Sequence, residues 1–239
     1  MSGLLDEVID AHGGIEHWKR RTKVTASIVS GGGLFALKGL PQDSEPRLMT
    51  VWLHEQRASV RPFGAPDQRT MFTPDRIAIE KLDGSLVAER HAPRDSFDGH
   101  VINTPWDPLH RAYFNGAALW TYLTTPFLLG MPGARVEEME PWREGQETWR
   151  VLRARFPASI GTHCSVQDFF FGDDLLLRRH DYTLDVAGGF AAAQLTSEYK
   201  EADGIRLPTR RRAYARAPDR RPIRDLLLVS IDIEDVRFE

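Results

Sequence analysis

A histidine and a tyrosine stand two positions apart in the stretch RRHDYTLDV, residues 178–186. Side chains alternate between the two faces of a strand, so His180 and Tyr182 share one face with the aliphatic Leu184. We expect that face to point inward. An imidazole and a phenol that project into an apolar pocket could orient a ligand or shuttle a proton. The alternative interpretation is that both are ordinary amphipathic residues near the rim of the protein.

A second pair with chemical potential is Asp107 and His110, at the start of a predicted helix. Residues three apart lie on one helical face, so the carboxylate could orient the imidazole as in a general-base pair. Asp107 is also a good N-cap, with Pro108 in the first helical position, which is a structural role. No nucleophile motif of the G-x-S-x-G kind accompanies the pair. The candidate catalytic residues are therefore His180, His110 and Asp107, and the sequence leaves open whether any catalysis occurs.

The remaining histidines and the single cysteine do not form a metal-binding pattern. His12 and His17 are five residues apart, which is not the i,i+4 spacing of a helical metal pair. We expect His12 to lie near a helix C-terminus, where a cation is favourable. Cys164 has no second cysteine with which to form a disulfide or a zinc site. We predict no metal and no cofactor.

Arginines gather in TRRRAYAR, residues 209–216, and in the DRRPIR that follows. Strand alternation separates Arg211 from Arg210 and Arg212, so they do not form one positive stripe. The whole chain carries a formal charge of −3. Because a nucleic-acid interface requires a basic patch, we predict no nucleic-acid partner.

Hydrophobic periodicity predicts two helical regions in the 239 residues. Residues 1–22 form a helix pair that turns at Gly13, a natural left-handed C-cap, and Trp18 anchors the second helix in the core. A central helix covers 105–126 and interrupts the strands.

The rest of the chain alternates as short antiparallel strands. Residues 23–92 predict a meander, which includes a strand in GLFALKGL (33–40) and a hairpin at Asp83-Gly84. Strands resume over 148–239. We count ten or eleven strands in one domain, 1–239, with no linker.

Two segments together resemble LolA/LolB-like half-barrel proteins. LLDEVIDAHGGIEHWKRRTKVTASIVSGG resembles their opening, with a helix, a glycine corner, a second helix and a first strand. SEYKEADGIRLPTRRRAYAR resembles their recurring hairpin, through Tyr199, Asp203, Gly204, Ile205, Leu207 and Pro208. The resemblance implies a mainly β (α+β) half-barrel: a single curved antiparallel sheet, plugged on its concave face by the helix pair and the central helix around an apolar cavity.

The favoured function is the binding of a hydrophobic small molecule, lipid or acyl chain in that cavity, since binding pockets are largely apolar with a few polar groups. His180 would be the polar handle. The expected lining is aromatic: Trp52, Phe114, Trp120, Phe127, Phe169, Phe171 and Tyr182. One alternative is a metal-independent enzyme that acts on a bulky apolar substrate with a histidine acid/base. Another is a structural or interaction protein whose aromatic residues fill a solid core.

The first residues carry acids where a signal peptide needs a basic and then an apolar region, so we expect a cytoplasmic protein. The apolar runs within 115–133 are too short to span a bilayer, which predicts no integral membrane association. The sequence does not predict the oligomeric state.

Overall fold

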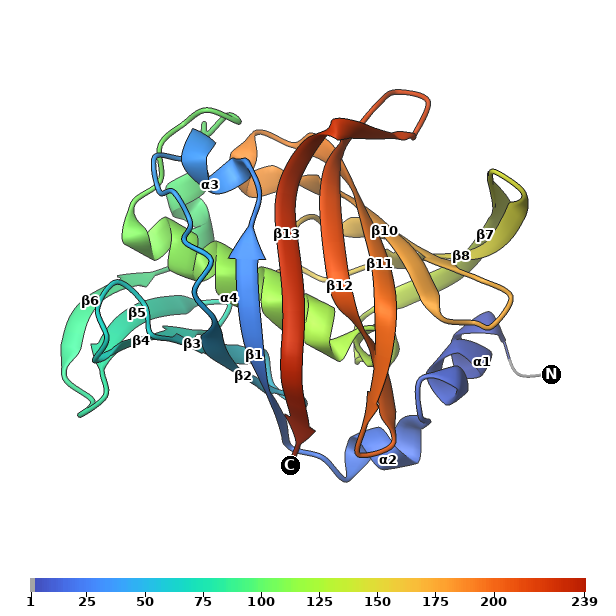
Figure 1. The fold of residues 1–239 in the computed structure, drawn as a ribbon, viewed down its shortest axis with the longest axis horizontal. Coiled ribbons are helices and arrows are strands. Elements are labelled where there is room, and N and C mark those ends of the chain that lie inside the picture. The colour runs from blue at the N-terminus through green and yellow to red at the C-terminus, as the bar shows by residue number, and fades with distance from the viewer. Residues whose placement is uncertain (1–2) are drawn as a thin grey trace.

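One strongly curved antiparallel sheet dominates the computed structural model, which describes residues 3–239 (Figure 1). Its strand order is β6-β5-β4-β3-β2-β1-β13-β12-β11-β10-β9-β8-β7. Strands that follow one another in sequence pair with each other, except that β6 and β7 lie at opposite edges and β1 pairs with β13 at the centre. Two successive meanders are therefore joined along β1 and β13, which confirms the predicted single curved antiparallel sheet.

The described residues contain thirteen strands rather than ten or eleven. The first meander comprises β1 (Lys23–Gly31), β2 (Arg47–Trp52), β3 (Arg57–Arg61), β4 (Gln68–Phe72), β5 (Arg76–Lys81) and β6 (Leu86–His91). The second comprises β7 (Arg135–Glu144), β8 (Glu147–Arg155), β9 (Val166–Phe171), β10 (Leu177–Leu184), β11 (Phe190–Ala202), β12 (Ile205–Arg216) and β13 (Pro222–Phe238). The sequence missed β7 because this edge strand is mostly exposed and has no alternating apolar face.

Helical segments lie between and before the meanders. They are α1 (Leu4–Ala11), α2 (Ile15–Lys19), α3 (Leu34–Leu37) and α4 (Pro108–Thr124), with the 3₁₀ turns η1 (Pro93–Phe97), η2 (Phe127–Gly130) and η3 (Asp185–Ala187). The strand predicted over 33–40 is wrong: α3 buries the adjacent Leu34 and Phe35, and so brief an apolar run does not distinguish a helix from a strand. None of the helices within residues 3–239 has the length and apolarity needed to cross a membrane.

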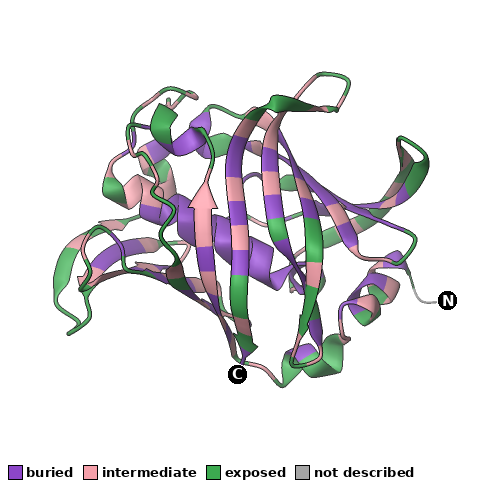
Figure 2. Ribbon diagram, in the orientation of Figure 1, coloured by how far each residue is buried: buried purple, intermediate pink, exposed green. Residues whose placement is uncertain are grey.

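α4 confirms the predicted central helix and crosses the concave face of the sheet (Figure 1). β6 and β7 are the two outer edges of the sheet, and α4 lies in the connection between them. All residues from Ala112 to Thr124 are buried, so the helix is covered on every side (Figure 2). A helix that is buried all round is typical of a core element.

α4 packs closely against only one half of the sheet. Its backbone lies against β2–β6, whereas β9–β12 are reached chiefly by long side chains. Gly116 permits the close approach, because a Cβ atom there would lie 2.3–2.8 Å from ring and Cβ atoms of Phe72 on β4.

The two segments that carry the half-barrel resemblance contact each other. Gly13 turns from α1 to α2 with a φ of 117°, and a Cβ atom there would lie 2.1 Å from the carbonyl oxygen of Gly204 in the β11–β12 hairpin. The amide of Arg206 donates a hydrogen bond to the His12 carbonyl at 3.0 Å. Trp18 stacks on Phe127 with ring centroids 4.2 Å apart, as expected for a core anchor.

We expect Gly116→Ala to destabilise the protein by about 1–3 kcal/mol, because overpacking against Phe72 outweighs the better helix propensity of alanine. Urea unfolding would measure the change. In a Phe72→Ala background the penalty should shrink, since two of the three nearest atoms are then absent. A stabilising Gly116→Ala would contradict the proposed close approach.

Candidate functional site

His180 and Tyr182 on β10 point inward, as the alternation predicted. Their side chains are 1% and 4% exposed, and they face α4 across the concave side of the sheet. The register places His180 opposite Phe169 of β9 and Gln194 of β11. The imidazole stacks on the Phe169 ring with centroids 4.3 Å apart.

Around them lies a group of buried polar side chains that we call the concave cluster. Its members are Tyr122, His163, Gln167, His180, Tyr182, Gln194 and Arg211. They come from α4, the loop before β9, and strands β9–β12. They therefore fill the side of the interior where the backbone of α4 is not in close contact with the sheet.

Hydrogen bonds within the concave cluster join α4 to the loop before β9 and to β10, and join β10 to β9. The Tyr122 hydroxyl lies 3.1 Å from Nε2 of His163 and 3.3 Å from the hydroxyl of Tyr182. Nε2 of His180 lies 2.6 Å from the Gln167 Oε1, an acceptor, so this nitrogen donates. His163 also stacks on Tyr182 at 4.3 Å.

Burial keeps these aromatic groups neutral. It lowers the pKa of His163 to about 3 and the pKa of His180 well below its usual 6.5. Burial also raises the pKa of Tyr122, and that of Tyr182 well above 10. None of the four groups therefore changes its charge near neutral pH.

Arg211 is the one charged member of the concave cluster. Burial lowers its pKa to about 10, which leaves it protonated at neutral pH. Its Nη1 donates to Gln194 Oε1 at 2.9 Å, and its Nη2 donates to the Tyr122 carbonyl at 2.7 Å. That carbonyl lacks its helical partner because the residue four positions on is Pro126, which has no N–H. Arg211 therefore supplies the hydrogen bond that this carbonyl lacks near the C-terminal end of α4.

No acidic side chain within residues 3–239 forms an ion pair with Arg211, and its buried Nε has no hydrogen-bond partner. Arg179 offers the contrast on the outer face of the sheet, since it is equally buried but forms a bidentate pair with Asp181 at 2.6 and 2.8 Å. An ionised group buried without a counterion is unfavourable in a folded protein. Arg211 is consequently a buried charge without a counterion at the centre of the concave cluster.

The predicted aromatic lining is largely brought into the core. Phe114, Trp120, Phe127, Phe169 and Phe171 are all buried there. Phe114 of α4 contacts the rings of Phe35 and Trp106. Phe127 stacks on Trp18 of α2, and Phe169 stacks on His180. The predicted lining residues therefore form part of the packed core in this structure.

Trp52 does not join the other predicted lining residues. It follows Val51, which is buried in the core, and alternation therefore turns Trp52 to the opposite face. There it is half-buried beneath the Arg57 guanidinium, 4.2 Å from the ring centroid.

Asp107 and His110 lie together, in the geometry of a capping box. The Asp107 carboxylate accepts from the His110 amide at 2.8 Å, and His110 Nδ1 accepts from the Asp107 amide at 3.1 Å. The second imidazole nitrogen lies 3.2 Å from the Ser96 carbonyl, and Arg90 pairs with Asp107. These contacts give both residues a role in starting α4.

Neither His163 nor Arg211 is among the site residues predicted from the sequence. Strand alternation separates Arg211 from Arg210 and Arg212, and this was the signal in the sequence that Arg211 lies on the other face of its strand. His163 precedes β9 in a loop, so no periodicity could have placed it. His12 differs from its expected cationic role: it is fully buried, donates from Nδ1 to the Val8 carbonyl, and has a pKa lowered by burial to about 4.

Three solved structures are similar to nearly the whole chain. A DUF1329 family protein from Desulfovibrio piger has a TM-score of 0.57 at 11% identity, with 99% of this chain and 92% of that one covered. A LolA superfamily protein from Nitrosomonas europaea has a TM-score of 0.57 at 11% identity, covering 98% and 92%. A domain from Vibrio parahaemolyticus, described as an outer-membrane lipoprotein-sorting protein, has a TM-score of 0.56 at 10% identity, covering 99% and 91%.

The chain therefore has a LolA-like fold, which confirms the resemblance of its two segments. At these identities the similarity shows the fold alone. No protein-family model matches the sequence, and no curated protein matches it.

The stability should fall in mild acid because of the buried histidines. Below pH 6.5 the unfolded chain binds protons at His12 and His163, whereas the native state does not until about pH 4 and about pH 3. The free energy of unfolding should therefore drop by about 1.4 kcal/mol per pH unit for each of them as the pH falls below 6.5. Urea unfolding across this range would measure the slope. His163→Gln should reduce it, and an unchanged slope would argue against a buried neutral imidazole.

Loss of the Asp181 charge beside Arg179 and loss of Arg211 itself should have different effects on stability. Asp181→Asn removes the closer and more deeply buried of the two acidic partners of Arg179 and leaves only Glu144 at 3.4 Å, so it should lower the free energy of unfolding by about 3–5 kcal/mol. Arg211→Met should change it by only about 1 kcal/mol, because the loss of two hydrogen bonds is offset by removal of a desolvated charge. Chemical denaturation of both variants provides the comparison. A larger loss for Arg211→Met would show that its charge is compensated in the folded state.

Proposed function

We propose that this protein binds a hydrophobic small molecule or acyl chain between α4 and strands β9–β12, with the polar head of the ligand at Arg211. The observation that carries the proposal is the buried guanidinium without an acidic partner, which lies among the neutral polar side chains of the concave cluster and next to the aromatic core. A ligand carboxylate or other oxygen-rich head would supply the missing acceptor at Nε.

The packing of α4 supports this location. The helix is held closely on β2–β6, while the other half of the sheet is separated from it by the side chains of the concave cluster and Phe169. Rotation of these side chains, with a shift of α4 away from β9–β12, would open a space between the aromatic core and the concave cluster, whose polar groups could fix the orientation of a ligand. The likeness to a lipoprotein-sorting domain is consistent with a hydrophobic cargo.

Acid–base catalysis receives less support than binding. An efficient general acid or base has a pKa near the working pH, whereas burial moves the pKa values of His180 and Tyr182 away from neutrality in opposite directions. His110 has both ring nitrogens engaged in contacts at the start of α4. These side chains are therefore better suited to position a ligand than to transfer a proton.

Native mass spectrometry followed by organic extraction would first show whether an apolar molecule is retained. Hexadecanoate and hexadecanol then separate the two parts of the proposal, since both present the same chain but only one carries a charge. The native protein should bind hexadecanoate more tightly than hexadecanol. Arg211→Met should weaken the binding of hexadecanoate by about tenfold to a hundredfold, as expected for loss of a charge-assisted hydrogen bond.

Arg210→Met is the matched control, because the neighbouring Arg210 side chain is exposed and pairs with Glu198 on the surface. It should bind both probes as the native protein does. Binding of neither probe, with no retained molecule, would reject the proposed function and favour a solid core.

A further inference from the structure

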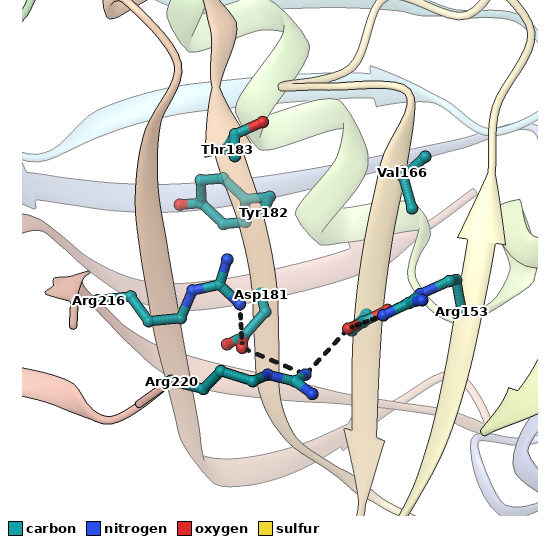
Figure 3. A pocket seen from close by; sticks show the side chains of 8 residues that line it. Arg153, Val166, Asp181, Tyr182, Thr183, Arg216 and Arg220 are labelled. Atoms are coloured by element: carbon teal, nitrogen blue, oxygen red, sulfur yellow. Dashed lines mark hydrogen bonds and ion pairs between the residues drawn. The ribbon is translucent and has the colours of Figure 1, made fainter. Parts of the chain in front are cut away.

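A separate pocket lies on the outer face of the sheet, away from α4 (Figure 3). Its volume is about 330 Å³, and three arginines, Arg153, Arg216 and Arg220, line it together with Asp168 and Asp181. The arginines come from β8, the end of β12 and the loop before β13, so they approach the pocket from three elements. Their side chains are 28%, 17% and 39% exposed, which leaves them accessible to a dissolved ligand.

Each of the two carboxylates of the pocket already accepts three hydrogen bonds from arginine side chains. Asp168 accepts Nε and Nη2 of Arg153 at 2.7 and 2.9 Å, and Nη2 of Arg220 at 3.0 Å. Asp181 accepts two bonds from Arg179 behind the pocket and one from Arg216 at 2.8 Å. These carboxylates hold the guanidinium groups in place.

The arginines retain unused donors. Each guanidinium has five N–H groups, yet Arg216 engages only Nη1, and Arg220 only Nη2, in the hydrogen bonds of this network. Around the pocket, four guanidinium groups face three carboxylates once Arg179 and its second acidic partner, Glu144, are included. The pocket therefore offers donors and a net positive charge.

The backbone and the aromatic residues beneath fix this arrangement. Ala193 of β11 pairs with Asp181 on one side, and its short side chain lets Arg216 reach across from β12. The carbonyl of Arg220 accepts a hydrogen bond from Arg179, which ties the loop to the sheet. The guanidinium groups of Arg179 and Arg220 lie over the Trp142 ring at 5.2 and 5.0 Å. Donors that are held in position before binding lose little entropy when a ligand arrives.

We propose that this outer pocket binds a phosphate-type oxyanion, either free phosphate or the phosphate group of a small monoester. Guanidinium groups that converge from three elements match a tetrahedral dianion with several acceptor oxygens better than they match a single planar carboxylate. The arginines and carboxylates of this pocket lie on the face of the sheet opposite the concave cluster, and Tyr182 of that cluster borders the pocket from within β10.

Titration with inorganic phosphate and with phenyl phosphate, at constant ionic strength in sodium chloride, would test the proposal. The readout is the Nε–H resonances of the arginines in ¹H–¹⁵N NMR spectra of the native protein. Both ligands should produce saturable shifts at Arg153, Arg216 and Arg220. Tighter binding of phenyl phosphate would indicate an organic monoester as the occupant, and equal binding would indicate free phosphate.

Arg216→Gln and Arg220→Gln should each weaken binding by roughly tenfold, the usual effect of losing one charge-assisted contact. Arg224→Gln is the control, because this arginine lies on the same side of the hairpin over the Tyr214 ring and outside the pocket. Shifts that do not saturate, or Gln variants that are folded and bind as the native protein does, would overturn the proposal. The arginines would then serve only to fasten the loop to the sheet.

Discussion

The connection between the two edges of the sheet determines how the interior is built. Because β1 and β13 pair at the centre, β6 and β7 lie at opposite edges, and the segment between them must traverse the sheet. The helix that does so, α4, supplies the second layer that the concave face needs in order to be buried. Its packing is asymmetric, close on β2–β6 and mediated by long side chains on β9–β12. The concave cluster exists because of this asymmetry.

The two faces of the sheet show two ways of burying arginine, at Arg179 of β10 and at Arg211 of β12. On the outer face Arg179 is neutralised by Asp181 and stacked on aromatic rings, so its charge strengthens a network. On the concave face Arg211 has only neutral acceptors, and the end of α4 contributes the partial negative charge of its last carbonyls. The same residue type is therefore fully paired in one place and keeps an Nε–H without a partner in the other.

The sequence predicted the architecture better than the site. Strand alternation and turn signals predicted the meanders, helical periodicity predicted α4, and glycine predicted the corner between α1 and α2, because all these features depend on local patterns. α3 and β7 were misassigned or missed, since a four-residue helix and an exposed edge strand carry little periodicity. His180 and Tyr182 were placed on the correct face by alternation alone. His163 and the role of Arg211 depend on which distant residues surround them, and Trp52 was included for its type although alternation turns it away from the core.

The central pairing of β1 with β13 affects the order in which the parts of the sheet fold. Contacts there join residues separated by 217 positions, for example Thr22 and Glu239. Each meander consists of pairings between neighbours in sequence and can form early, whereas the seam between the meanders closes only after the last strand is available. Until then β1 and β12 each have an unpaired edge that can associate with other chains. The order of synthesis thus makes the middle of the finished sheet its last part to form.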